Sequence, residues 1–284
     1  MERSTVLVVI DKDCSDASLK GYINSIPEAG VHLSFLVVGT AAPLPVWAYG
    51  SAPYGPVVFP EDWHQQYQAT GKAVTEKAEY VEQTLLRAKA EGDVRSVFCE
   101  PVALDEAVAA HATLSDLVFL DPALSMSERL FEAALFGVLF QSPVGVVLNS
   151  SEISPVLATK HPFVAWDESQ PAVRAVHRAL PILKQAEKVT IAVFDPDTDS
   201  GSNGGNPGSD LATWLSRHGC NVTVQQYPSG DREIGTCIQD KATETGADLI
   251  IMGAYSHSRF REQLLGGTTQ TLIEQTRHRV LLAH

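Results

Sequence analysis

The sequence is poor in cysteine, and its cysteines are spaced without a pattern. There are four in 284 residues, at positions 14, 99, 220 and 237, and no two of them form a CxxC pair. A disulfide framework or a structural zinc site normally shows paired or regular spacing. The nine histidines are scattered, with no HExxH or similar spacing. We therefore expect reduced thiols and no metal site.

Long apolar runs are also missing. The most apolar segment, 130–150, is interrupted by Glu132, Gly137, Gln141 and Pro143, so it falls short of the roughly 18 apolar residues that mark a membrane span. The first apolar run near the N-terminus meets acidic residues at once and has no small-residue cleavage site behind it, unlike a secretory signal. We expect a cytoplasmic protein with no membrane partner.

Positive charge is scarce as well. The chain has 21 Lys and Arg against 34 Asp and Glu, a net charge of -13, which argues against a general affinity for nucleic acid. The deficit is uneven: residues 1–155 carry 9 basic and 20 acidic side chains (net -11), whereas residues 156–284 carry 12 and 14 (net -2). An anionic ligand would therefore meet less repulsion in the second half.

What the sequence does contain is a regular alternation of β-branched runs with amphipathic or Ala-rich stretches of helical length. This pattern is typical of βα units around a parallel sheet, and the chain length suits two domains. We predict an α/β fold made of two doubly wound, Rossmann-like domains, each with a five-stranded parallel sheet. The predicted strands are 5–11, 31–39, 94–100, 116–121 and 144–149 in the first half, and 163–167, 189–195, 221–227, 247–254 and 279–283 in the second.

The two halves are similar beyond their strand count. Both first strands end in an aspartate followed by a polar turn, at Asp11 and Asp167, and both fourth strands share one plan, DLVFLD and DLIIMG. This repeat indicates duplication of a whole domain, and we place the domains at 1–152 and 160–284. The first copy carries most of its extra residues at 40–71, which contains five prolines and reads as too irregular for a helix or strand.

A glycine loop follows the fourth strand of the second copy. Gly253 closes the strand, and Gly266, Gly267, Thr268 and Thr269 precede a helix that we expect to begin near residue 270. Glycines let a backbone approach a ligand closely, and the free amides of a first helical turn favour an anion. The threonines add hydroxyl donors at the expected N-cap. These are the parts of a phosphate cradle.

The spacing G-x2-S-x9-G-G-T after a DLIIMG strand resembles the nucleotide loop of the universal stress protein family, G-x2-G-x9-G-[ST], and the duplicated plan resembles its tandem, two-domain type. In ATP-binding members the aspartate ending the first strand meets adenine, a residue ending the second strand packs on the base, and the glycine loop binds ribose and phosphates. The resemblance implies ATP, with or without Mg²⁺, as the ligand. It places the cofactor-binding residues at Asp167, Phe194, Gly253, Ser256, Gly266, Gly267, Thr268 and Thr269.

The sequence departs from the family pattern in both copies. In the second copy the second motif glycine is Ser256, and the residue after Gly266 is Gly267 in place of Ser or Thr. In the first copy Pro122 and Ala123 stand at the cradle entrance and no Gly-Gly-Thr follows. We therefore expect the first copy to have lost phosphate binding.

Several of these residues also have simpler structural interpretations. Asp11 and Asp167 can be helix N-caps or turn formers, and Arg259 and Arg261 can be solvated charges. His257 invites a general-base role, but no nucleophile or paired carboxylate accompanies it, so we assign no catalytic residue. The aromatic residues of 40–71 can form a binding lid or pack that loop onto its own domain.

Three functions remain in view. The preferred one is a stress-response or regulatory protein that binds an adenine nucleotide in its second domain, with at most slow ATP hydrolysis because no Walker lysine is present. Family resemblance also implies pairing of the two copies through their fifth strands, and a homodimer. The alternatives are a nucleotide-free dimerising scaffold and an enzyme such as a nucleotidyl transferase, which lacks its HxGH-type motif here.

Overall fold

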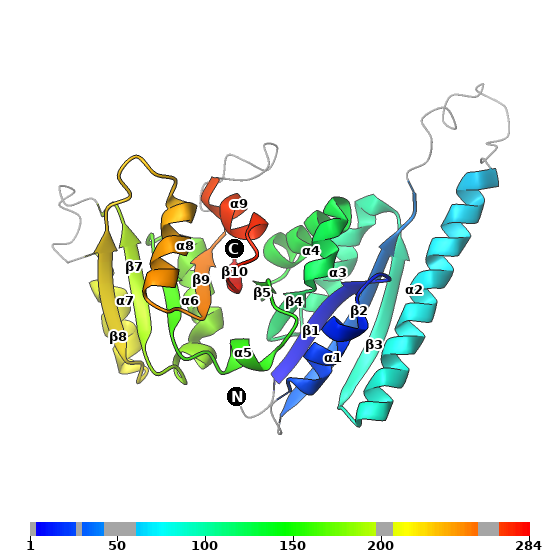
Figure 1. Ribbon diagram of the computed structural model, residues 1–284, viewed down its shortest axis with the longest axis horizontal. Coiled ribbons are helices and arrows are strands. Elements are labelled where there is room, and N and C mark those ends of the chain that lie inside the picture. Colours follow the sequence, from blue (N-terminus) through cyan, green and yellow to red (C-terminus); the bar gives the residue numbers. More distant parts are fainter. Residues whose placement is uncertain (1–3, 27–29, 43–60, 197–206, 255–266) are drawn as a thin grey trace.

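The structure is a computed structural model that describes residues 4–26, 30–42, 61–196, 207–254 and 267–284. Its described part is a single twisted sheet of ten strands with helices on both faces (Figure 1). The strands are β1 (Ser4–Asp11), β2 (Val31–Thr40), β3 (Gly92–Cys99), β4 (Leu117–Leu120), β5 (Gly145–Leu148), β6 (Pro162–Ala165), β7 (Val189–Phe194), β8 (Val222–Tyr227), β9 (Leu249–Gly253) and β10 (Val280–Ala283). All ten predicted strands are confirmed, with ends that differ by one or two residues.

The helices occupy the connections between strands, as the βα pattern requires. They are α1 (Asp16–Asn24), α2 (Glu61–Ala88), α3 (Leu104–Ala112), α4 (Glu128–Gln141), α5 (Ser154–Leu157), α6 (Gln170–Leu183), α7 (Ser209–Arg217), α8 (Ile234–Glu244) and α9 (Gly267–Glu274). Two 3₁₀ helices, Pro101–Ala103 and Pro122–Met126, follow β3 and β4.

Strand order shows two copies of one topology. It runs β3-β2-β1-β4-β5-β10-β9-β6-β7-β8, so each half has the doubly wound arrangement in which the first strand lies between the second and the fourth. All neighbours within a half are parallel. The predicted α/β fold class is correct, and ligands of such sheets bind beyond the carboxyl ends of the strands where the order reverses.

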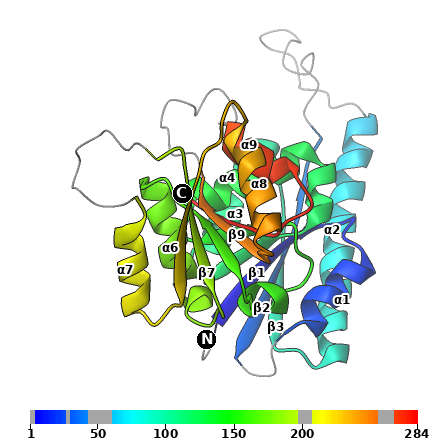
Figure 2. The same ribbon diagram turned by 60° about the vertical axis from the view of Figure 1, so that its left-hand side comes forward.

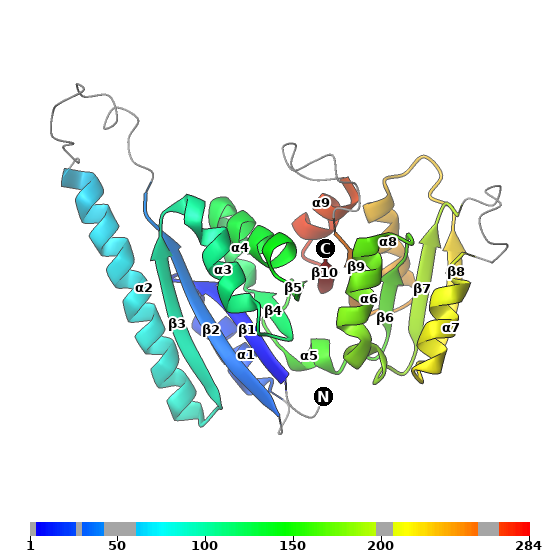
Figure 3. The same ribbon diagram turned by 180° about the vertical axis from the view of Figure 1, so that it is seen from behind.

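The two halves meet edge to edge. β5 and β10 pair antiparallel, with Val147 opposite Leu281. The side-chain amide of Asn149, just after β5, donates to the backbone oxygens of Gln275 (2.6 Å) and His278 (3.2 Å) in the turn before β10. Figures 1 and 3 show α5 running beneath this junction as the connection from β5 to β6.

Each face of the sheet has its own apolar core. One core lies between one face of the sheet and helices α1, α2, α6 and α7. The other core lies between the opposite face and helices α3, α4, α8 and α9. Alternation of side chains along each strand produces this division, because successive residues point to opposite faces. Figure 2 shows the helices stacked on either side of the twisted sheet.

The expectation that 40–71 is irregular is wrong for the part that the structure describes. Thr40 ends β2, and residues 61–71 form the first turns of α2. All five prolines of the segment lie between positions 43 and 60, so none interrupts the helix once it has begun. Trp63 lies on this helix, and its indole N–H donates to the oxygen of Ala42 (2.8 Å).

Within the described ranges, no helix is both long and apolar enough to cross a membrane.

Candidate functional site

The carboxyl ends of β6, β7 and β9 lie side by side. Register pairs Ala165 of β6 with Ala192 of β7 on one side and with Met252 of β9 on the other. The residues that follow these pairs therefore share one edge of the sheet, at the point where strand order reverses. This arrangement brings together three of the predicted site residues, Asp167, Phe194 and Gly253.

Asp167 lies two residues beyond β6 and is exposed. Its Oδ1 accepts a hydrogen bond from the backbone N–H of Ser169 (3.1 Å), which makes it a turn former. The N-cap of α6 is Ser169, whose side chain accepts from the N–H of Ala172, so an N-cap role for Asp167 is wrong. Its second carboxylate oxygen has no hydrogen-bond partner among the described residues.

Phe194, the last residue of β7, is half-buried and lies against an aromatic neighbour. Its ring centroid is 5.4 Å from that of Tyr227 at the end of β8, with the two planes 32° apart. The next residue, Asp195, is left-handed (φ 45°) and accepts hydrogen bonds from the N–H (2.7 Å) and the hydroxyl of Ser229. These bonds lower the pKa of Asp195 and hold the ends of β7 and β8 together.

Gly253 closes β9 where α6 begins. A Cβ added to it would lie 2.4 Å from the backbone nitrogen of Ala172 and 2.6 Å from the carbonyl carbon of Pro171. Both distances are far below van der Waals contact, so only glycine allows the strand to approach the first turn of α6. This packing by itself accounts for the glycine.

Helix α9 begins at Gly267, three residues earlier than expected, so Thr268 and Thr269 belong to its first turn and do not precede it. A Cβ on Gly267 would have only one neighbour within 4 Å among the described atoms, Oε1 of Glu233 at 3.9 Å. Thr269 is buried, at 5% exposure, whereas Gly267 is open to solvent. The first turn of α9 thus presents backbone with open space in front of it.

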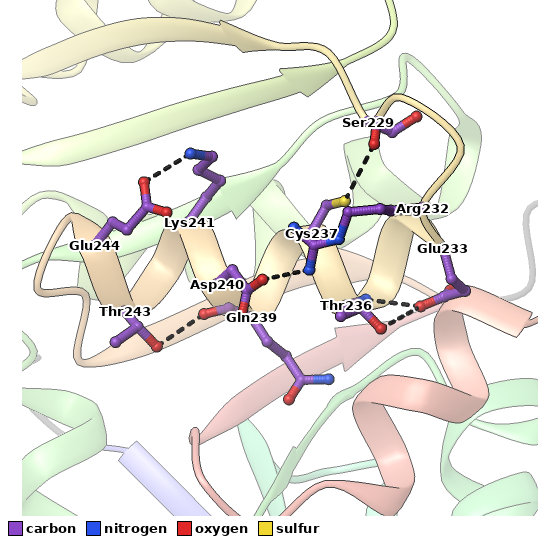
Figure 4. A network of polar contacts seen from close by, with 10 residues as sticks. All are labelled: Ser229, Arg232, Glu233, Thr236, Cys237, Gln239, Asp240, Lys241, Thr243 and Glu244. Carbon is purple, nitrogen blue, oxygen red and sulfur yellow. Dashed lines mark hydrogen bonds and ion pairs between the residues drawn. The ribbon is translucent and has the colours of Figure 1, made fainter.

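Two residues that the sequence did not reveal position this turn. Glu233 caps α8, accepting from the backbone N–H groups of Gly235 (2.8 Å) and Thr236 (2.7 Å), and Figure 4 shows its bonds to Thr236. Partial burial works against ionisation, but these bonds outweigh it and lower the pKa of Glu233. A Cβ on Gly235 would lie 2.8 Å from Cβ of Thr271 and 3.0 Å from the oxygen of Thr268, so α8 and α9 touch here. Glutamate is an uncommon N-cap, which is why the sequence offered no signal.

Comparison with known proteins agrees with the fold described above. Residues 222–284 match the Universal stress protein family. A universal stress protein from Archaeoglobus fulgidus DSM 4304 has a similar structure, with a TM-score of 0.65 at 19% identity, over 98% of this chain and 97% of that one. A putative universal stress protein from Pseudomonas aeruginosa UCBPP-PA14 gives a TM-score of 0.52 at 14% identity, over 99% and 93%. No curated protein gives a significant match.

The chain has the fold of a tandem universal stress protein. The family match lies in the second copy, which has the glycine loop, and the structural matches span both copies. Four further residues of the expected universal stress protein loop, Ser256, His257, Arg259 and Arg261, lie outside the described residues, as does Gly266. Among the described residues, no group of three or more His, Cys, Asp or Glu side chains could hold a metal ion.

The first copy of this universal stress protein fold has a different structure at the corresponding edge. Seven residues, 121–127, connect β4 to α4, compared with thirteen, 254–266, between β9 and α9. The short connection is filled by the 3₁₀ helix Pro122–Met126, which Asp121 caps by accepting from the N–H of Ala123 (3.0 Å). No glycine lies in this connection, so the backbone has no cradle of the kind expected in the second copy.

Asp121 stands where the second copy has Gly253. It is 1% exposed, and its Oδ2 has no hydrogen-bond partner among the described atoms. Burial raises the pKa of Asp121 and the pKa of Asp11, which ends β1. Burial and the charge of Asp121 also raise the pKa of the Cys14 thiol to about 12. A phosphate would here meet buried acids in place of open backbone.

Proposed function

We propose that this protein is a cytoplasmic tandem universal stress protein that binds ATP, or a related adenine nucleotide, in its second copy and acts as a stress-response or regulatory module. The observation that carries the proposal is the shared edge at β6, β7 and β9. There, a carboxylate (Asp167), a half-buried ring (Phe194) and the open first turn of α9 lie around the point where strand order reverses. Ligands of doubly wound sheets bind at such points.

The available chemistry suits each part of the nucleotide. The second oxygen of Asp167 can accept from the amino group of adenine, and Phe194 offers a ring face for the base. The amides at the start of α9 can receive phosphate, with the partial positive charge of the helix N-terminus in support. The near-neutral charge of residues 156–284 adds little repulsion. We include Ser256 and Gly266 in the site as the remaining members of the loop.

The residues also suit Mg²⁺ alongside the phosphates. Glu233 has a lowered pKa, so it is ionised at neutral pH, and its Oε1 lies beside Gly267. A carboxylate next to bound phosphate is repulsive unless a cation lies between them. When bound, Mg²⁺ would neutralise phosphate charge, and we assign Glu233 and Thr268 as the residues that would hold it together with the phosphates. We assign no residue a catalytic role, so any hydrolysis would be slow.

Equilibrium dialysis with labelled ATP tests the proposal through one substitution and a matched control. Gly267→Asp puts an acid into open space at the start of α9, where it should abolish binding by repelling phosphate. Ser216→Asp puts the same acid at an exposed position in the last turn of α7, which leads to the amino end of β8 and so to the opposite edge of the sheet, and should leave binding unchanged. Absence of binding at millimolar ATP, or equal binding by wild type and Gly267→Asp, would overturn the site assignment.

A nucleotide-free scaffold is the second candidate, and the β5–β10 ladder favours it. The two copies share one continuous sheet through Val147 and Leu281, which makes a rigid platform with β3 and β8 as its free edges. We include intramolecular pairing and a homodimer in both proposals. Mass spectrometry of small molecules released from the denatured purified protein separates them, because retained adenine nucleotide counts against a scaffold.

A further inference from the structure

A groove opens at the carboxyl edge of the first copy, away from the proposed nucleotide site. Its volume is about 410 Å³, within the range of small-molecule pockets. We call it the copy-one groove. Its lining comes from the end of β2, the first turns of α2, the start of the 3₁₀ helix after β3 and the start of α4: Thr40, Ala41, Ala42, Gln66, Ala69, Thr70, Pro101, Ser127 and Arg129.

The charge of the copy-one groove is opposite to that of its surroundings. Residues 1–155 carry a net charge of -11, yet the described residues of the lining include no carboxylate and a single cation, Arg129. Arg129 is exposed and forms no ion pair or hydrogen bond with any residue that the structure describes. Two exposed acids, Glu100 and Glu128, adjoin the lining in sequence, but Arg129 is the charged side chain that lines the groove itself, so a monoanion in the groove would pair with Arg129 directly.

Apolar side chains surround the copy-one groove. Five large hydrophobic residues are exposed in the described part of the chain, and three of them adjoin lining residues: Tyr67 (39% exposed), Val102 (82%) and Met126 (91%). They are next in sequence to Gln66, Pro101 and Ser127. The other two, Leu86 and Leu114, lie at the opposite ends of α2 and α3 from the groove. Exposed apolar residues that gather around a cavity mark a binding surface, whereas single ones do not.

The α2 wall of the groove is held firmly. Trp63 donates its indole N–H to the oxygen of Ala42 (2.8 Å), and Tyr67 packs edge-on against Phe98 of β3 with centroids 4.9 Å apart. These contacts fix the first turns of α2 against the ends of β2 and β3. A preformed wall lowers the entropic cost of binding.

We propose that the copy-one groove binds a small amphipathic anion, a molecule with one carboxylate and a linear apolar chain. The carboxylate would pair with Arg129, and the chain would lie along the alanines of the lining towards Val102 and Met126. A nucleotide is the wrong occupant, because the β4–α4 connection has no glycine and Asp121 occupies the corresponding cradle position. The inference does not depend on nucleotide binding by the second copy.

Titration calorimetry with octanoate tests this on the full chain, at a concentration below micelle formation. Octanoate should bind, whereas butyrate, which lacks the apolar chain, and 1-octanol, which lacks the charge, should bind at least about tenfold more weakly. Arg129→Gln should weaken octanoate binding about tenfold or more, since it removes the charge-assisted contact. Arg95→Gln on the exposed edge strand β3 removes an arginine outside the groove and should change nothing.

A second pair of variants tests the apolar rim. Met126→Ser should weaken octanoate binding several-fold because it removes apolar contact area, and Leu114→Ser, equally exposed but away from the groove, should not. Equal binding of octanoate and octanol, or octanoate binding that survives Arg129→Gln, would overturn the proposal as nonspecific apolar adsorption. Arg129-dependent displacement of octanoate by ATP would overturn the choice of occupant. The Gly267→Asp variant should bind octanoate normally, which separates this test from that of the nucleotide site.

Discussion

The position where a side chain on Gly253 would begin is 2.4 Å from the backbone nitrogen of Ala172. This close approach places the end of β9 directly against the first turn of α6. Asp167 and Ser169 form the turn that precedes this helix. The spacing between the two sides of the candidate site therefore depends on a missing Cβ. A Cβ added at position 253 would push β9 and α6 apart.

Gly253→Ala should destabilise the protein by about 1–3 kcal/mol, the usual effect of forcing a methyl group into a packed contact. Urea denaturation measures the change. Gly145→Ala on β5 is the control, because a Cβ there has its nearest neighbour at 3.4 Å, an ordinary contact, so a much smaller loss is expected. Equal losses for both variants would show that the contact with Ala172 is not the cause.

Asp121→Asn should stabilise the protein at neutral pH by about 1 kcal/mol, since it removes a buried carboxylate with an unpaired oxygen. Because the pKa of Asp121 is raised in the folded state, the folded protein holds the proton more tightly than the unfolded chain. Wild-type stability should then fall as pH rises from the unfolded pKa through the folded one. Denaturation from pH 4 to pH 7 measures this, and the advantage of Asp121→Asn should shrink towards pH 4. An advantage that does not vary with pH would contradict the assignment to ionisation.

Asn149→Ala should weaken the junction between the copies by about 1–2 kcal/mol. It removes the donor to Gln275 and His278 and leaves alanine in the left-handed conformation (φ 60°) that asparagine tolerates. Asn149→Gly also removes the donor but relieves the backbone, so it should lose less. Thermal unfolding of the two variants measures both effects. Identical, negligible losses would show that the amide does not link the copies.

Glu233→Ala should lower stability by about 0.5 kcal/mol, near the low end for a helix cap because the carboxylate is exposed and screened by solvent. The pKa of Glu233 is lowered in the folded state, so its contribution is present above the unfolded pKa and is lost as pH falls through the folded pKa. The difference between wild type and variant in urea should therefore disappear in acid. Thr243→Ala, at the far end of α8, is the control for loss of a polar side chain.

Strand positions could be predicted from sequence because they depend on local patterning. Runs such as VLVVID and DLIIMG are apolar on both faces, as central parallel strands must be, and their bounds in the structure differ little. The start of α9 was misplaced by three residues because glycine and threonine are weak helix formers, so Gly267 and Thr268 read as loop. Contact with α8 through Gly235 supports that turn, and such tertiary contact overrides local propensity.

Some residues of the candidate site could likewise be predicted from the sequence, and others could not. Asp167, Phe194 and Gly253 could be named from the repeat and the resemblance, and the sheet brings them to one edge. Glu233 and Gly235 could not be named, because their role rests on where α8 meets α9. The same holds for Asp121, which reads as an ordinary strand-end residue until its burial is known.

The sequence by itself determined the duplicated α/β plan, the ten strands and the uneven charge of the two copies, because periodicity and composition are properties of the chain alone. Only the tertiary structure decided the antiparallel register in which β5 and β10 meet, that Asp121 is buried without a described partner for Oδ2, and that a groove with one unpaired arginine lies in the more acidic copy. The physical reason is that strand pairing, burial and cavities arise from residues far apart in the chain, and each is settled by which surfaces exclude water together.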